Sequence, residues 1–239
     1  MIYSNNNIIN FYNIKFYNWT YSSIIKKISN GGYLCAPAAF PLCEIKREKN
    51  YFKSLKNSNI NLLDSGYFCI LLRIFKRIKV KKFSGFLFLL KFLNDKSLKK
   101  NRILFIDPTI NDSKHNAILL AKKRFKNFFN YVAPIYYSTK SYQDKKLFDL
   151  INKIRPKFIV INISGLKQEY LAYVIMKKIK FKLSILCLGG AISFITKTQA
   201  PINPFFDKYY MGWLIRIIFS PRIFIRRTIR SISLIKFFF

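Results

Sequence analysis

An aspartate stands where an apolar segment of the sequence gives way to a turn. Asp64 follows the apolar run at 59–63 and precedes Ser65 and Gly66. A carboxylate at the end of a strand can act as a general base that removes a proton from a hydroxyl, or it can hold a sugar by hydrogen bonds. The structural alternative is an Asx-turn, in which the side chain caps its own loop. The residue types alone leave both interpretations open.

A cation and an amide that could bind a phosphorylated ligand stand at other segment boundaries. Lys82 belongs to a basic cluster with Lys79 and Lys81, so it could contact an anion or simply be solvated. Gln168 lies between a predicted strand and a predicted helix, where backbone N–H groups face an anion and the amide offers both donors and acceptors. Alternatively, the segment is an ordinary polar first turn of a helix, in which the helix dipole favours the negative charge of Glu169.

The elements that would position these residues alternate along the chain. The patterning predicts strands at 33–43 (with a turn), 59–64, 102–107, 131–137, 157–163 and 183–188, and helices at 46–58, 67–78, 86–93, 112–126, 142–153 and 168–178. This alternation predicts an α/β, Rossmann-like domain with a mostly parallel sheet flanked by helices. Ligands in such sheets bind beyond the carboxyl ends of the strands, so we expect Asp64, Asp107, Ser164 and the pair Gly189-Gly190 along one edge. The two glycines would permit close approach of a ligand, or form a plain tight turn.

The two ends of the chain differ from this domain at 31–210. Residues 1–30 show no clear period and are expected to be a loosely held extension. Residues 211–239 are expected to form a helical, basic, amphipathic appendage, with Ser220 as an N-cap before Pro221. Arg222 and Arg226 share one side of this helix with other arginines, and most of its Phe and Ile residues occupy the other side. Such a helix binds a membrane surface, reaches phosphates as a lid, or packs on the domain as an ordinary helix.

The composition restricts the possible partners. The chain has 43 Lys and Arg against 10 Asp and Glu, a net charge of +33, which indicates an anionic partner or a biased composition with a solvated surface. The four cysteines form no C-x-x-C pair and a single histidine is present, so no metal site is expected. The N-terminus lacks a signal-peptide pattern and no apolar run reaches the roughly 20 residues of a spanning helix. These features predict a cytoplasmic protein that, at most, lies on a membrane.

Several short segments together resemble a known family. They are 164–169 (SGLKQE), 184–190 (SILCLGG), Ala200-Pro201, 212–216 (GWLIR) and 220–227 (SPRIFIRR). Their order and spacing resemble the C-terminal half of the WecG/TagA/CpsF glycosyltransferases, and the similarity extends back to about residue 30. These bacterial enzymes transfer N-acetylmannosamine-type sugars from UDP to a lipid-linked acceptor, in cell-surface polysaccharide synthesis.

The resemblance implies a role for each candidate residue. Asp64 would be the catalytic base of an inverting, metal-independent transfer that needs no cofactor. The substrate-binding residues would be Lys82, at a family arginine position, together with Gln168, Gly189, Gly190, Arg216, Arg222 and Arg226. The implied partners are a UDP-sugar donor, a polyprenyl-diphosphate-linked sugar acceptor and an anionic membrane surface, to which the protein would be peripheral.

The chain also departs from the family pattern. Family polar positions are replaced by Ala36 (threonine in the family), Ala38 (asparagine), Ser193 (an acid) and Gly212 (glutamate), and the family proline before Lys-Gln-Glu is Leu166. Ser65 separates Asp64 from its glycine, and Asp107-Pro108 stands where the family has a glycine loop. A catalytically degenerate homologue is therefore one alternative. A basic nucleic-acid-binding protein of the organellar ribosomal type is another; its charge and aromatic residues permit it, although the basic residues are spread along the chain without a recognised RNA-binding motif.

Overall fold

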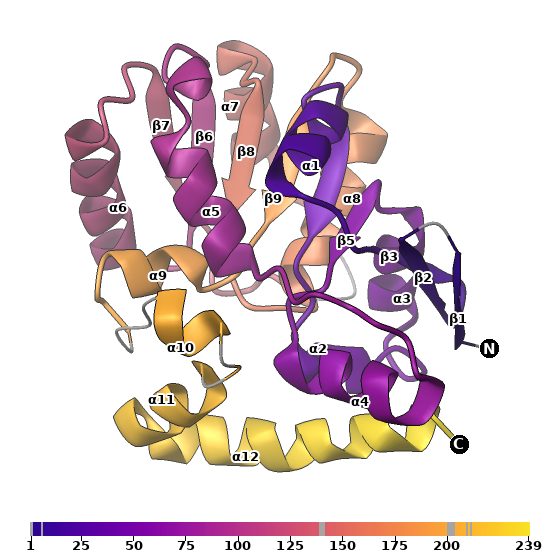
Figure 1. Cartoon of the computed structure of the whole chain (residues 1–239). Coiled ribbons are helices and arrows are strands. Elements are labelled where there is room, and N and C mark those ends of the chain that lie inside the picture. Colours follow the sequence, from indigo (N-terminus) through magenta and orange to yellow (C-terminus); the bar gives the residue numbers. More distant parts are fainter. Residues whose placement is uncertain (1, 6, 139–141, 200–203, 209, 211) are drawn as a thin grey trace.

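The structure of the protein is a computed structural model that describes residues 2–5, 7–138, 142–199, 204–208, 210 and 212–239 (Figure 1). Ala200, Pro201 and Met211, which belong to segments singled out above, lie outside the described residues.

The described strands form one mixed sheet of nine. They are β1 (Ile2–Asn5), β2 (Ile8–Phe11), β3 (Ile14–Tyr17), β4 (Gly32–Cys35), β5 (Ile60–Leu62), β6 (Ile103–Asp107), β7 (Phe128–Val132), β8 (Phe158–Ile161) and β9 (Ser184–Cys187). The strand order is β1-β2-β3-β5-β4-β9-β8-β6-β7. Only the pairs β1–β2 and β2–β3 are antiparallel within this sheet. The predicted α/β, Rossmann-like class is confirmed.

Some helices lie on the two faces of this sheet and others lie at the foot of the molecule (Figure 1). They are α1 (Tyr21–Ile28), α2 (Ala39–Cys43), α3 (Lys49–Asn57), α4 (Gly66–Lys76), α5 (Gly85–Asn94), α6 (Ile110–Lys122), α7 (Lys145–Ile154), α8 (Lys167–Lys178), α9 (Ala191–Ile195), α10 (Pro204–Lys208), α11 (Gly212–Phe219) and α12 (Pro221–Ile232), with the 3-10 helices η1 (Lys96–Leu98) and η2 (Ser233–Phe237).

Two apolar layers separate the sheet from its helices. Successive residues of a strand point to opposite faces, so in β4 Tyr33 and Cys35 join the layer under α3, α4, α7 and α8, whereas Leu34 joins the layer under α1, α5, α6 and α9. In Figure 1, α5 lies in front of the sheet and α8 behind it. Because helices cover both faces, the central strands are continuously apolar, as their sequences predict.

The described residues of the N-terminal segment are not loosely held, which corrects the expectation for 1–30. Strands β2 and β3 form a hairpin whose side chains Phe11 and Phe16 are fully buried. The two-residue turn between them, Tyr12-Asn13, has φ of 51° and 65°. This left-handed pair is the geometry that matches the twist of a hairpin, and asparagine tolerates it well.

Some boundaries also differ from the sequence expectations. The strand expected at 131–137 lies at 128–132, as β7. The helix expected to begin near Asp112 begins at Ile110, because Thr109 accepts the capping hydrogen bond from the backbone N–H of Asp112. Ser220 does occupy the cap position of α12, but its side chain makes no capping bond there.

The C-terminal residues divide into an outer helix and a buried end. Figure 1 shows α12 lying across the foot of the molecule, joined to α11 and passing below α2. Beyond it, Leu234, Phe237 and Phe238 are buried, and both phenylalanine rings pack against Phe11. The run of three phenylalanines at 237–239 predicts apolar contact with a membrane, but this prediction is wrong for Phe237 and Phe238, because both are buried in the core. Within the described part of the chain, every helix is too short or too polar to cross a bilayer.

Candidate functional site

Asp64 lies just beyond the carboxyl end of β5 and faces the first turn of α5. Ser84 caps α5 by accepting a hydrogen bond from Leu87 N. The N–H of Gly85, in the first turn, has no acceptor within the helix and points toward Asp64. Gly85 N donates to Asp64 Oδ1 at 2.8 Å. Burial raises the pKa of the Asp64 carboxyl, and Lys82, the Gly85 hydrogen bond and Arg216 oppose that rise. A carboxylate with a raised pKa is a stronger base, which suits proton abstraction.

Lys82 forms a buried ion pair beside this carboxylate. Its Nζ lies 2.6 Å from Asp207 Oδ1 and 2.8 Å from the Asp207 carbonyl oxygen. The other carboxylate oxygen, Asp207 Oδ2, accepts a hydrogen bond from Ser84 Oγ at 2.7 Å. Asp207 therefore holds Lys82 and the start of α5 together.

Arg216 adds a second cation to this group. Its guanidinium stacks over Phe194, with Cζ 4.6 Å from the ring centroid. Burial lowers the pKa of Arg216, and the nearby carboxylates of Asp64 and Asp207 oppose that effect. Its Nε is buried without a hydrogen-bond partner among the described residues. The structure thus brings Asp64, Lys82 and Arg216 close to one another.

Tyr210 packs over the same group. A Cβ at Gly66 would lie 2.5 Å from Tyr210 Cδ1, so a larger residue there would displace the ring. The cations of Arg73 and Lys82 lie 5.7 Å and 5.6 Å from the Tyr210 ring centroid, within the range of a cation–π interaction. A glycine is thus required at position 66, because the residue there packs closely against the Tyr210 ring.

Gln168 is tied to the glycine pair. Its Oε1 accepts a hydrogen bond from Gly189 N at 2.8 Å, and its Nε2 donates to Glu169 Oε1 at 2.9 Å. Gly189 has φ of 56°, which glycine adopts without steric cost. Glu169 is fully buried, with Oε2 lacking a partner among the described residues, and burial raises its pKa to about 7. The helix start that carries Gln168 is therefore held from within the protein.

The backbone just before Gln168 is strained. Leu166 has φ of 74°, an uncommon value for a residue with a Cβ. Proline cannot adopt this conformation, because its ring fixes φ near −65°. Leu166 thus replaces the family proline at a position whose backbone conformation proline cannot adopt.

The Asp64 group and the Gln168 group meet between α5 and the end of β9. A Cβ at Gly85 would lie 3.7 Å from the carbonyl oxygen of Leu188, the residue before Gly189. The same Cβ would lie 2.9 Å from the Cβ of Ala36, which occupies the family threonine position. A departure from the family pattern therefore lies directly beside the residue that binds Asp64.

Three other candidates lie apart from this contact network. Arg222 and Arg226 are exposed on α12. Asp107, at the end of β6, is fully buried and accepts hydrogen bonds of 2.8 Å from the side chains of Asn116, Asn130 and Asn162. Its carboxylate is thus occupied by structural hydrogen bonds.

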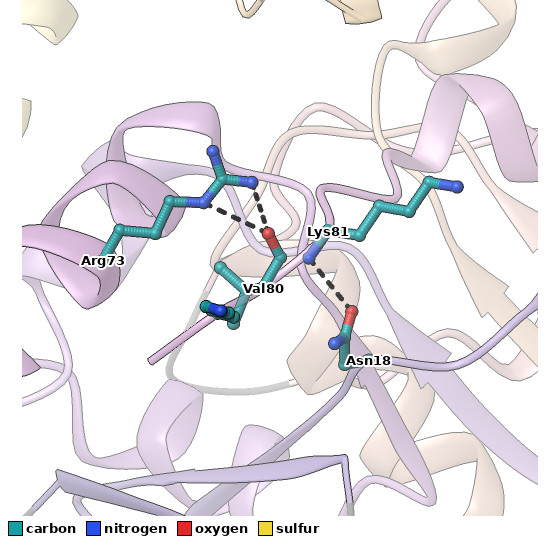
Figure 2. A pocket seen from close by; sticks show the side chains of 5 residues that line it. Asn18, Arg73, Val80 and Lys81 are labelled. Atoms are coloured by element: carbon teal, nitrogen blue, oxygen red, sulfur yellow. Dashed lines mark hydrogen bonds between the residues drawn. The ribbon is translucent and has the colours of Figure 1, made fainter. Parts of the chain in front are cut away.

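A shallow basic pocket adjoins the Lys82 segment (Figure 2). Its volume is about 360 Å³ and it is lined by Asn18, Arg73, Lys79, Val80 and Lys81. Arg73 holds its wall by donating from Nε to the Val80 carbonyl at 3.2 Å, and Lys81 N donates to Asn18 Oδ1 at 3.1 Å. Neither Asp64 nor Gln168 lines this pocket, so it is distinct from the carboxylate site.

The second carboxylate of the site, Asp207, is not predicted from the sequence. Acidic residues are scarce in this chain, and every charged residue after Asp207 is basic. An isolated acid in such a segment is a signal of a specific pairing. Ser84 is likewise not predicted as a site residue, because a serine before an apolar helix is explained by its capping role alone.

A mostly parallel sheet with polar groups gathered beyond the carboxyl ends of its strands is the architecture of a ligand-binding α/β protein. A family model described as the glycosyl transferase WecG/TagA/CpsF family matches residues 9–239. The chain belongs to this family of glycosyltransferases. A search of curated proteins found no match.

Proposed function

We propose that the protein transfers an N-acetylmannosamine-type sugar from a UDP-sugar to a lipid-linked saccharide, in cell-surface polysaccharide synthesis. The single observation that supports this most is the placement of Asp64, with its desolvated carboxyl at the start of α5 and two cations nearby. The family membership supplies the class of reaction, and the site supplies groups of the right chemistry for it.

In this mechanism, Asp64 removes the proton from the acceptor hydroxyl as that oxygen attacks the anomeric carbon. The bond between the anomeric carbon and the diphosphate oxygen breaks on the opposite face, so the configuration inverts and UDP leaves with the bonding electrons. Lys82 and Arg216 stabilise the negative charge that develops on the diphosphate, in place of a metal ion. Gln168 and the Gly189-Gly190 turn contact the sugar or the nucleotide.

The test of catalysis is transfer of radiolabelled sugar from a UDP-sugar to undecaprenyl-diphosphate-linked N-acetylglucosamine. We expect Asp64→Asn to lower kcat by about 10²- to 10⁴-fold while donor binding is retained, because a general base acts mainly in the transition state. Asp149→Asn, an exposed change on α7 with the same charge, is the matched control. Equal rates in wild type and Asp64→Asn would remove Asp64 from the mechanism.

Absence of transfer by the wild-type protein with every donor tried would support the degenerate-homologue alternative. Ala36, beside Gly85, is the position at which that loss would first be sought. Ala36→Thr restores the family residue, and gain of transfer in this variant would identify the missing group.

We further propose that residues 211–239 bind the surface of an anionic membrane, and that 31–210 carry the sugar-donor site, to which Arg216 of α11 is added. On α12 the exposed side chains Ile225, Ile229 and Ile232 form one stripe, with fractional exposures of 44%, 61% and 57%. The exposed arginines Arg222 and Arg226 form a stripe beside it. Such a helix inserts its apolar stripe at the interface while its cations meet acidic lipids. From this position Arg222 and Arg226 would also reach the diphosphate of a membrane-bound acceptor.

Co-sedimentation with phosphatidylglycerol vesicles tests this. We expect the triple change of Arg222, Arg226 and Arg230 to Glu to abolish sedimentation, since each charge contributes about 1 kcal/mol near an acidic surface. The matched control changes three exposed lysines of α7, Lys145, Lys146 and Lys153, to Glu. Equal loss in both variants would show that total charge, and not α12, governs binding. Steeply salt-dependent RNA binding without sedimentation would favour the nucleic-acid alternative.

A further inference from the structure

The carboxylate of Asp207 occupies a site that is built for an anion. Lys82 Nζ and Ser84 Oγ each contact a different oxygen of this carboxylate, at 2.6 Å and 2.7 Å. Both groups are buried, since the side chain of Lys82 is 10% exposed and Ser84 is 2% exposed. We name these two donors the Lys82–Ser84 site.

The positive and negative charges around this site are equal in number only while Asp207 is present. Two cations, Lys82 and Arg216, face two carboxylates, Asp64 and Asp207. If Asp207 withdraws, one negative charge remains against two positive charges, and the site gains affinity for an incoming anion. Ion pairs of low exposure are costly to desolvate, so loss of one partner creates a strong demand for another.

A phosphate group would use the same donors. Phosphate and carboxylate oxygens both accept short, charge-assisted hydrogen bonds from ammonium and hydroxyl groups. The Lys82–Ser84 site also lies at the first turn of the ten-residue helix α5, whose dipole favours negative charge. A second, independent feature points to a ligand here, because Arg216 Nε is buried and lacks a partner among the described residues.

We propose that the Lys82–Ser84 site binds a phosphate group of the sugar donor, that Ser84 is a further donor-binding residue, and that Asp207 is an internal anion that the donor must displace. This inference rests on the proposed function and deepens it, since it assigns the position of one phosphate and the contact that competes with it. Asp207 then lowers the apparent affinity for the donor by the fraction of molecules in which it fills the site.

The test uses inorganic pyrophosphate as the probe, measured by titration calorimetry on the full chain. We expect Asp207→Asn to bind pyrophosphate about tenfold more tightly than wild type, because the competing charge is gone and the open fraction rises. Asp149→Asn makes the same charge change on the exposed face of α7 and is expected to bind like wild type. Asp207→Ser carries the same expectation as Asp207→Asn and replaces it if that variant does not fold.

The role of Ser84 is tested in the Asp207→Asn background, where its hydroxyl has lost the internal carboxylate. Ser84→Gly removes the hydroxyl, while glycine still serves as a helix cap at little cost. We expect this change to weaken pyrophosphate binding about tenfold, the effect of one hydrogen bond to a charged group. Unchanged binding would remove Ser84 from the phosphate contact.

The outcomes separate this inference from the proposed function. Weaker or unchanged pyrophosphate binding in a folded Asp207 variant would show that Asp207 positions Lys82 instead of competing with the ligand, and would overturn the inference. Sugar transfer by wild type with an unchanged donor KM in Asp207→Asn would also overturn it while the function stands. Tighter pyrophosphate binding without transfer of any sugar would support the phosphate site and overturn the function.

Discussion

The buried C-terminal end makes a sharp prediction about stability. Phe238 is 4% exposed and packs against the rings of Phe11, Phe68 and Phe75, at centroid distances of 6.0, 6.2 and 6.0 Å. We expect Phe238→Ala to lower the free energy of unfolding by about 3–5 kcal/mol, the cost of lost burial plus the cavity left behind. For a chain of this size the melting temperature would fall by roughly 6–20 °C.

The neighbouring residue supplies a matched control. Phe239 is 87% exposed, so Phe239→Ala should change the free energy of unfolding by no more than about 0.5 kcal/mol. Urea denaturation followed by circular dichroism measures both variants. A similar, small effect of the two changes would refute the conclusion that Phe238 is part of the core, and would make it available to a membrane surface.

Two predictions concern ionisable groups. Burial raises the pKa of Glu169 in the folded protein to about 7. The wild type should therefore lose on the order of 3 kcal/mol of stability as the pH rises from about 4.5 through 7, and Glu169→Gln should not show this loss. Parallel pH–stability curves of the two proteins, measured by urea denaturation, would contradict this. Burial raises the pKa of Asp64, and the charge of Lys82 lowers it. Lys82→Gln should therefore move the acid limb of the pH profile of kcat/KM to higher pH, because the base is lost as the pH falls through its pKa. An acid limb that does not move would mean that another group titrates there.

The central sheet was predictable because its strands are covered on both faces. Runs such as 102–107 and 157–163 can only be buried strands once helices flank them, and β6 and β8 lie there. The N-terminal hairpin was missed although its signal was present. Phe11 and Phe16 belong to short alternating strands on either side of Tyr12-Asn13, but each strand has only four residues, too few for a clear period.

The positions of the candidate residues were predictable where a residue follows a strand, but not where tertiary contacts bring distant residues together. Asp64 and Gln168 followed from their positions after strands. Asp207 comes from a five-residue helix more than a hundred residues from Lys82, and local pattern cannot reveal that pairing. Likewise, an amphipathic pattern placed Arg222 and Arg226 on one helix face but could not show that α12 presents them to solvent.

The contact between the N-terminal hairpin and η2 also constrains the order of folding during synthesis. Phe11 reaches its native packing only when Phe237 and Phe238 are in place, and the Tyr12 hydroxyl donates to the carbonyl oxygen of Phe237 at 3.1 Å. A growing chain therefore carries an open aromatic face on its first hairpin until residues 237 and 238 have left the ribosome. Contacts of such long sequence separation slow folding and prolong the exposure of apolar surface. Because η2 follows α12 directly in the chain, we expect α12 to reach its place in the same late step that closes the core.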